Sequence, residues 1–286
     1  MLGIEQDFFE FEADMLNVRN FARSVFGDFR ARYIPLLMVY FAYGASGFSG
    51  IAESFWVKEH LSLSADALAI IGFWVGVPWT IKMVFGQFAD SIRIFGSGRK
   101  IYIFFGACFI ALGQIIFIGL AAKSILLLSF GMPETFFFLA SVISVVGFVL
   151  QDVIADAMST EVVDKVDSYG KQRQQSDIDS ELANVQWLGR ISLMVAGAAV
   201  AGLGGWLAQI FSYTIIFSLA LFVPAISVTG AIFVRLNETP PSPINWTILG
   251  GGSLFAFFVV FVNLLSIPYG AEIVFAISLA TICFLI

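Results

Sequence analysis

The chain has 286 residues, of which 59% are hydrophobic and only 13% are charged, and its 32 phenylalanines are too many for a soluble domain to bury. The solvent of this protein is therefore lipid, and the net charge of −6 excludes nucleic-acid binding as a main task. A single histidine rules out a His-based metal site. We find no Ser-His-Asp set, phosphate-binding glycine loop or metal cluster, so neither an enzyme nor a bound cofactor is expected.

The first 32 residues are expected to form a cytoplasmic segment. They begin acidic, where a secretory signal peptide would be basic. Residues 15–30 place apolar side chains on one side of a helix and charged side chains mostly between them. This pattern fits either an amphipathic helix on the membrane surface or a partly disordered tail.

Apolar stretches long enough to cross a membrane follow, since a spanning helix takes about 20 residues. They cover residues 33–57, 67–89, 101–121, 134–158, 183–209, 212–234, 247–267 and 270–286. The two cysteines, Cys108 and Cys283, lie inside these stretches and are expected to be packing residues. The polar stretch 161–181 is expected to be a mobile cytoplasmic loop, and the Pro-rich stretch 235–246 a cytoplasmic linker between two bundles.

The predicted fold is therefore all-α, that of a polytopic membrane protein with the plan of many secondary transporters. A six-helix bundle over residues 33–234 is followed by the first two helices of a second bundle over residues 247–286. Because the last apolar stretch stops with the chain, we expect the sequence to be an N-terminal fragment of a longer protein.

The lysines and arginines predict the orientation. Leaving aside Lys82 and Arg190, eleven precede the first span or lie after spans 2, 4 and 6, and only Lys58 and Lys123 lie on the other side. Positive residues concentrate in cytoplasmic loops. The N-terminus and the loops after spans 2, 4 and 6 are therefore expected to be cytoplasmic.

Charged residues inside spans are costly and usually functional. Here they are Glu53, Lys82, Asp152, Asp156, Arg190 and Glu272. Glu53 fits an outer gate or the membrane interface, of which we favour the interface, and Glu272 is expected to be interfacial. Helical rise places Lys82, Asp152 and Arg190 each about 12 Å from the cytoplasmic edge, with Asp156 one turn nearer to it.

The spacing of Asp152 and Asp156 puts both carboxylates on one face of span 4, which must look into the bundle. We expect Asp152 to face Lys82 and Arg190, and Asp156 to face the basic loop after span 2. Two interpretations stay open. The four residues form buried ion pairs that fix helix packing, or one aspartate carries a proton while Lys82 or Arg190 holds an anionic substrate. A gate whose pairs break on opening is a third possibility.

The segment from residue 77 to residue 102, "VPWTIKMVFGQFADSIRIFGSGRKIY", carries a second pattern. Gly86, Asp90, Arg99 and Lys100 resemble the inner-loop signature of the major facilitator superfamily. Gly86 permits close helix contact, and Asp90 can pair at the start of a neighbouring helix. Arg99 and Lys100 can pair with acids at the inner end of span 4, such as Asp156 or Glu161, and so latch the cytoplasmic side. Alternatively, the two basic residues only anchor the loop at the membrane.

Together "PWTIK", "FGSGRK" and "DVIADAM" resemble the folate–biopterin transporter family within that superfamily. The resemblance covers spans 1 to 6 and implies a major facilitator fold and a secondary transporter, expected to be proton-coupled, for folates or pterins. Met83 departs from it, since the family favours proline there, and "LGRISLMVAGA" resembles the related muropeptide permeases and acetyl-coenzyme A transporters instead. The family-like residues are Pro78, Trp79, Lys82, Gly86, Asp90, Gly96, Arg99, Asp152 and Asp156.

Under this interpretation the substrate is an organic anion and the protein acts as a monomer in the bilayer. Lys82 and Arg190 suit the carboxylates of a folate, Trp79 can stack on its flat ring, and protonation of Asp152 couples transport to the proton gradient. Transport of another solute, such as a muropeptide or an acyl-nucleotide, remains an alternative. So does a membrane assembly factor without transport activity.

Overall fold

The computed structural model describes residues 30–167, 169–237 and 239–264. The predicted surface helix, apart from Arg30, lies outside the described residues, as do the predicted last span, Glu272 and Cys283. Within the described part the chain is helical, with two isolated β-bridges and no strand, which confirms the predicted all-α class.

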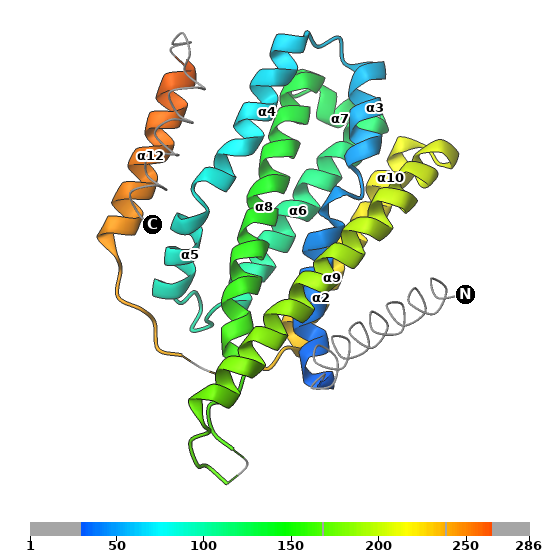
Figure 1. Cartoon of the computed structure of the whole chain (residues 1–286). Helices are drawn as coiled ribbons and strands as arrows, with labels where there is room; N and C mark the ends of the chain where they lie inside the picture. Colours follow the sequence, from blue (N-terminus) through cyan, green and yellow to red (C-terminus); the bar gives the residue numbers. More distant parts are fainter. Residues whose placement is uncertain (1–29, 168, 238, 265–286) are drawn as a thin grey trace, which may run out of the picture.

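Six stretches of the described chain are helical, long and apolar enough to cross a membrane. They are Ala31–His60, Ala65–Ser91, Lys100–Ala121, Pro133–Glu161, Gln175–Ile210 and Tyr213–Phe233. They coincide with the first six predicted spans, so the protein is an integral, multi-pass membrane protein. The seventh predicted stretch contains the helix α12 (Trp246–Leu264), which lies beside α5 (Figure 1).

Three spans are interrupted, and two of the breaks lie close to a proline. The first consists of α2 (Ile34–Gly44), a 3-10 turn (Ala45–Gly47) and α3 (Gly50–His60). The second divides into α4 (Ala65–Thr80) and α5 (Lys82–Ser91), because Pro78 has no N–H to donate and Ile81 leaves the helical conformation. The sixth divides at Leu221 into α10 (Tyr213–Ala220) and α11 (Phe222–Phe233), shortly before Pro224.

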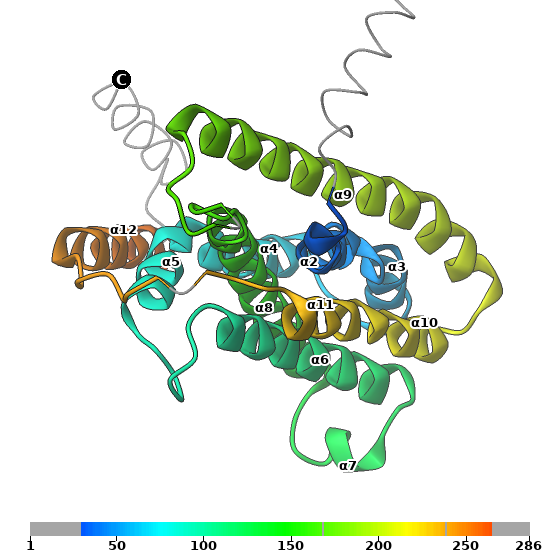
Figure 2. The ribbon, with the colours of Figure 1, turned by 90° about the horizontal axis from the view of Figure 1, so that it is seen from below.

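The centre of the bundle is the pair α6 (Lys100–Ala121) and α8 (Pro133–Glu161), which run side by side (Figure 1). Their backbones approach at two glycines. A Cβ atom on Gly147 would lie 2.5 Å from the carbonyl oxygen of Gly106. Seen from below in Figure 2, α2 lies between α11 and the long helix α9 (Gln175–Ile210). Small residues at such contacts let membrane helices pack closely.

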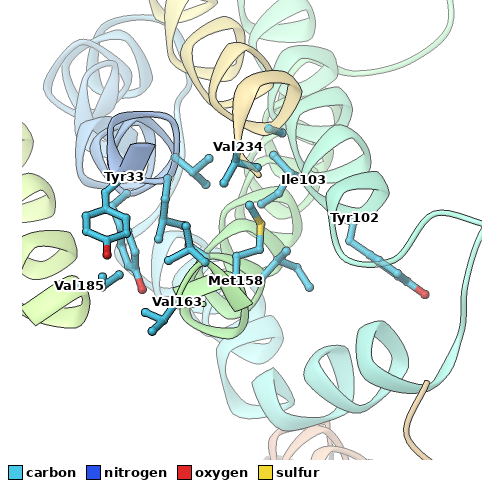
Figure 3. Packing of buried hydrophobic residues seen from close by; sticks show 14 of the residues in the cluster. Tyr33, Tyr102, Ile103, Met158, Val163, Val185 and Val234 are labelled. Atoms are coloured by element: carbon cyan, nitrogen blue, oxygen red, sulfur yellow. The ribbon is translucent and has the colours of Figure 1, made fainter. Parts of the chain in front are cut away.

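One end of the bundle carries the connections 92–99 and 162–174 and the segment 234–245, and we call it the loop end. The opposite end carries the connections 61–64 and 122–132, the latter including the short helix α7 (Ile125–Leu128). A buried core near the loop end joins α6, α8 and α9 to the ends of α2 and α11, as Tyr33, Met158, Val185 and Val234 show in Figure 3. This core holds α8 in a fixed position, and α8 carries both aspartates of interest.

The fifth span differs from its prediction. α9 begins at Gln175, whereas the predicted span begins at residue 183, so part of the predicted loop 161–181 is helix. The added turns bury Ile178 and Glu181. Hydropathy detects only the apolar part of a helix, and the polar first turns of α9 extend beyond that part.

Candidate functional site

A charged cluster lies inside the bundle where α5, α8 and α9 meet. Lys82 is the first residue of α5, directly after the break at Ile81. Its ammonium group forms an ion pair with Asp152 of α8 and lies 3.9 Å from Oδ2 of Asp156. Asp152 is only 3% exposed, whereas the side chain of Lys82 is more than one-third exposed. A buried carboxylate is thus neutralised by a cation that other molecules can reach.

Asp156 is held by side chains from two further helices. The hydroxyl of Tyr40 on α2 donates to its Oδ1 at 2.9 Å. Nη2 of Arg190 on α9 lies 3.1 Å from each carboxylate oxygen. Gly189 makes room for this arrangement, because a Cβ atom there would meet the ring of Tyr40 at 2.7 Å.

These contacts correct part of the predicted pairing. Arg190 forms its ion pair with Asp156 rather than with Asp152, and Asp156 lies in the cluster rather than against the basic loop. The predicted pair between Lys82 and Asp152 is present. Depth along each helix was predictable, but the direction in which α9 presents Arg190 depends on helix packing.

A cavity of about 360 Å³ opens beside Asp156 and Arg190. Its remaining lining residues are Tyr40, Ser159, Ala183, Gln186 and Trp187. The cavity is of a size that small ligands occupy. It offers a guanidinium group and an indole ring, which suit an anionic group and a flat apolar surface respectively.

Trp79 is not part of this cavity. Its ring lies 6.2 Å from that of Tyr43, between centroids, and lines a second cavity of about 770 Å³ toward the opposite end of the bundle. Glu53 lines the same second cavity, between α3, α4, α6 and α8. Glu53 thus lines a cavity between helices, and its interfacial position stays a prediction.

The predicted latch residues meet at the loop end, except for Asp156, which lies in the charged cluster. Nη2 of Arg99 lies 2.8 Å from Oδ1 of Asp90, and its Nη1 lies 3.2 Å from Oε1 of Glu161. Lys100 donates to the carbonyl oxygen of Val234 at 2.6 Å. Of the two acids predicted as partners of Arg99, Glu161 pairs with it and Asp156 does not, because five residues turn a helix by about 140° beyond a full turn.

The other parts of this network involve the segment after α11. Thr239 donates its hydroxyl to Glu161, and the backbone N–H of Ser242 donates to the carbonyl of Asp90 at 2.9 Å. Gly86 faces Val153 of α8, where an added Cβ atom would lie 3.2 Å from Cγ1. The loop-end network therefore joins α5, α6, α8 and the segment 234–245.

Sequence reasoning missed Gln114 and Ser144, which also line the second cavity and are buried. Neither residue is charged, so neither stands out in an apolar stretch by the cost of an intramembrane charge. Gln114 in "IALGQIIFIGL" was the available signal, because burying an amide away from water is costly unless it is hydrogen-bonded.

The fold and the cluster define an all-α, multi-pass membrane protein with opposite charges enclosed between its helices. Residues 44–245 match the model of the BT1 family, and the chain belongs to that family. This confirms the predicted resemblance to the folate–biopterin transporters and the placement within the major facilitator superfamily.

Three curated proteins illustrate the relationship. The chain is 27% identical to the folate-biopterin transporter of Synechocystis sp. over 72% of its own length and 37% of that protein. It is 24% identical to the probable folate-biopterin transporter 4 of Arabidopsis thaliana over 72% of its length and 38% of that protein. It is 25% identical to folate transporter 1 of Plasmodium falciparum over 65% of its length and 33% of that protein. The matched region thus spans between 33% and 38% of the length of these relatives.

Proposed function

We propose that this protein is a secondary active transporter that moves folate- or pterin-like organic anions by alternating access, coupled to protons. The observation that carries the proposal is the charged cluster of Lys82, Asp152, Asp156 and Arg190 beside a cavity. The names of the relatives, which are folate or folate-biopterin transporters, support the substrate class. A protein that only had to pack its helices would gain little from such charges.

The coupling follows from competition for the same cations. A substrate carboxylate that binds Lys82 must replace Asp152, which would leave a buried carboxylate without its partner. Protonation of Asp152 removes that penalty, because a neutral acid is far less costly to bury than a carboxylate. Substrate binding and proton uptake therefore favour each other. Arg190, half-exposed beside the cavity, holds a second anionic group.

The loop-end network acts as the latch of the alternating cycle. Arg99 bridges Asp90 and Glu161, so α5, α6 and α8 are tied together at that end while the network is intact. Access from the loop end requires the three helices to separate and these pairs to break. The distribution of lysines and arginines supports a cytoplasmic loop end and a cytoplasmic N-terminus.

The proposed organisation follows from the same plan. Residues 33–234 form the N-terminal six-helix bundle, residues 235–246 form a cytoplasmic linker, and residues 247–286 begin a second bundle. Residues 1–32 precede the first span on the cytoplasmic side. The transporter needs no cofactor and works as a monomer in this scheme.

A substrate panel tests the proposal. Purified full-length natural protein is reconstituted in vesicles preloaded with unlabelled folate, and exchange for labelled folate is measured against protein-free vesicles. Competition by biopterin, a muropeptide and acetyl-coenzyme A then ranks the solute classes. We expect folate and biopterin to compete and the others not to compete. Competition only by a muropeptide or by acetyl-coenzyme A would change the substrate class, and absence of folate exchange by folded protein would contradict folate transport.

A further inference from the structure

The second cavity contains a set of polar groups that the charged cluster does not use. The cavity of about 770 Å³ lies between α3, α4, α6 and α8. Four aromatic side chains line it, namely Trp79, Phe117, Phe137 and Phe148. The polar lining residues are Ser46, Glu53, Ser54, Lys58, Gln114, Ser141 and Ser144. The cavity therefore combines apolar and aromatic walls with several polar groups, which is typical of a ligand site.

Two of the polar side chains of this wall, Glu53 and Gln114, are linked by hydrogen bonds through Ser49. The hydroxyl of Ser49 donates to Oε1 of Glu53 at 2.5 Å and accepts from Nε2 of Gln114 at 3.3 Å. This uses a donor of Gln114 and leaves its carbonyl oxygen Oε1 buried without a partner among the described residues. The hydroxyl of Ser144 is likewise buried and unpartnered there. Buried polar atoms normally have partners, so two such atoms at one cavity need an explanation.

Glu53 differs from the aspartates of the charged cluster. Within the described part of the chain it forms no ion pair with any lysine or arginine, although Lys58 lines the same cavity. Its hydrogen-bond partner there is the hydroxyl of Ser49. The acceptor that this wall offers to a ligand is the carboxyl group of Glu53, because the amide oxygen of Gln114 and the hydroxyl of Ser144 are themselves buried between the helices. A ligand with N–H donors can bind this carboxyl group.

We propose that this cavity binds the pteridine ring of the substrate, with the amino and ring N–H groups directed at Glu53 and the ring face against Trp79. The inference rests on the proposed function, because folates and biopterin share this ring. A pteridine is flat, aromatic and rich in N–H donors along one edge. Stacking on an indole and hydrogen bonds to a carboxylate match both properties.

The position of the cavity relative to the charged cluster fits a folate bound across both. Ser144 precedes Asp152 on α8 by two turns, which is about 12 Å of helix. Trp79 precedes Lys82 by one turn, across the break at Ile81. A folate whose ring occupies the second cavity can extend its glutamate tail to Lys82 and Arg190. The two ends of the substrate are thus recognised by two separate sets of residues.

Binding of two half-ligands tests this division. The full-length natural protein in lipid nanodiscs is titrated with biopterin, which has the ring without a glutamate tail, and with p-aminobenzoylglutamate, which has the tail without the ring. We expect Glu53→Gln to weaken biopterin and folate about tenfold or more and to leave p-aminobenzoylglutamate unchanged. Lys82→Met should give the opposite pattern.

The matched control is Glu59→Gln, the same chemical change one and a half turns along α3. Glu59 accepts from the hydroxyl of Tyr213 at 2.7 Å and does not line the cavity. All three ligands should bind this variant as they bind the wild type. Should Glu53→Gln not fold, Trp79→Leu is used, for which we again expect weaker biopterin and an unchanged tail ligand.

Each remaining outcome is decisive. Unchanged biopterin binding in folded Glu53→Gln would overturn the inference while leaving the proposed function intact. Equal weakening of all three ligands would also overturn it, because the effect would then not be specific to the ring. If folded wild-type protein binds none of the three, the proposed function fails together with the inference.

Discussion

Nη2 of Arg190 on α9 lies 3.1 Å from both carboxylate oxygens of Asp156 on α8. This ion pair lies beside the cavity of about 360 Å³, so the guanidinium is bound on one side and accessible on the other. A cation in that situation can exchange one anion for another without leaving its position.

Replacing Arg190 should weaken the binding of an anionic substrate. Arg190→Gln removes a charge-assisted hydrogen-bond donor, and we expect the dissociation constant for folate to rise about tenfold or more. Titration calorimetry in nanodiscs measures this. Arg173→Gln is the matched control, because Arg173 pairs with Glu181 at 2.7 Å near the loop end and does not line the cavity. Equal affinities of the two variants for folate would contradict a role of Arg190 in substrate binding.

Replacing Asp152 should separate coupling from transport. Asp152→Asn resembles the protonated acid permanently, so Lys82 stays available to substrate but no proton is carried. We expect loss of gradient-driven accumulation and retention of folate exchange between the two sides. Asp66→Asn, an exposed carboxylate in the first turn of α4, should change neither. Uphill uptake by Asp152→Asn at the wild-type level would contradict the coupling role.

The contact of α6 with α8 should not tolerate a methyl group. Gly147→Ala puts a Cβ atom 2.5 Å from a backbone oxygen of Gly106, and backbone cannot turn away as a side chain can. We expect destabilisation of about 1–3 kcal/mol, measured as a lower unfolding temperature in detergent. Gly76→Ala in α4, where nothing lies within 4 Å of an added Cβ, should be neutral or stabilising because alanine favours helix.

The loop-end network should contribute to stability through Glu161. Glu161→Gln leaves Asp90 as the one carboxylate paired with the largely buried Arg99, beside the carbonyl of Ala157, and we expect a loss of about 1–3 kcal/mol. A double-mutant cycle with Arg99→Gln should show coupling between the two residues. Glu134→Gln, at the opposite end of the same helix, should cost well under 1 kcal/mol. Additive effects of Arg99→Gln and Glu161→Gln would argue against the network.

The orientation can be measured by labelling single cysteines. In a background with Cys108 and Cys283 replaced by alanine, Tyr169→Cys lies in the loop 162–174 and Leu126→Cys lies in α7 at the other end. Both side chains are exposed. In intact cells a membrane-impermeant maleimide should label position 126 only, and position 169 should react after permeabilisation. The reverse pattern would invert the proposed topology.

The fold was predictable because hydropathy and length alone identify spans, and all six stretches appear as predicted to within a few residues except at the start of α9. The pair of Lys82 with Asp152 was predictable because both depths follow from helical rise. The partner of Asp156 was not, since Tyr40 and Arg190 reach it only through the way α2 and α9 pack on α8.

Two features of the site could not be predicted from the sequence. Glu161 and Asp156 were equally available to Arg99 by position, and only the direction in which α8 faces decides between them. Gln114 and Ser144 carry no charge, so their importance becomes visible only when burial and missing partners are known. Glu53 could not be placed because its depth alone fits both an interface and a cavity.

The central claim is proton-coupled uptake of a folate-like anion, and gradient-driven uptake tests it most directly. Vesicles containing the full-length natural protein take up labelled folate with and without an imposed proton gradient directed inward. The account predicts accumulation above the external concentration only when the gradient is present, and its collapse when a protonophore is added. Uptake that merely equilibrates folate, at the same rate with and without the gradient, would contradict it.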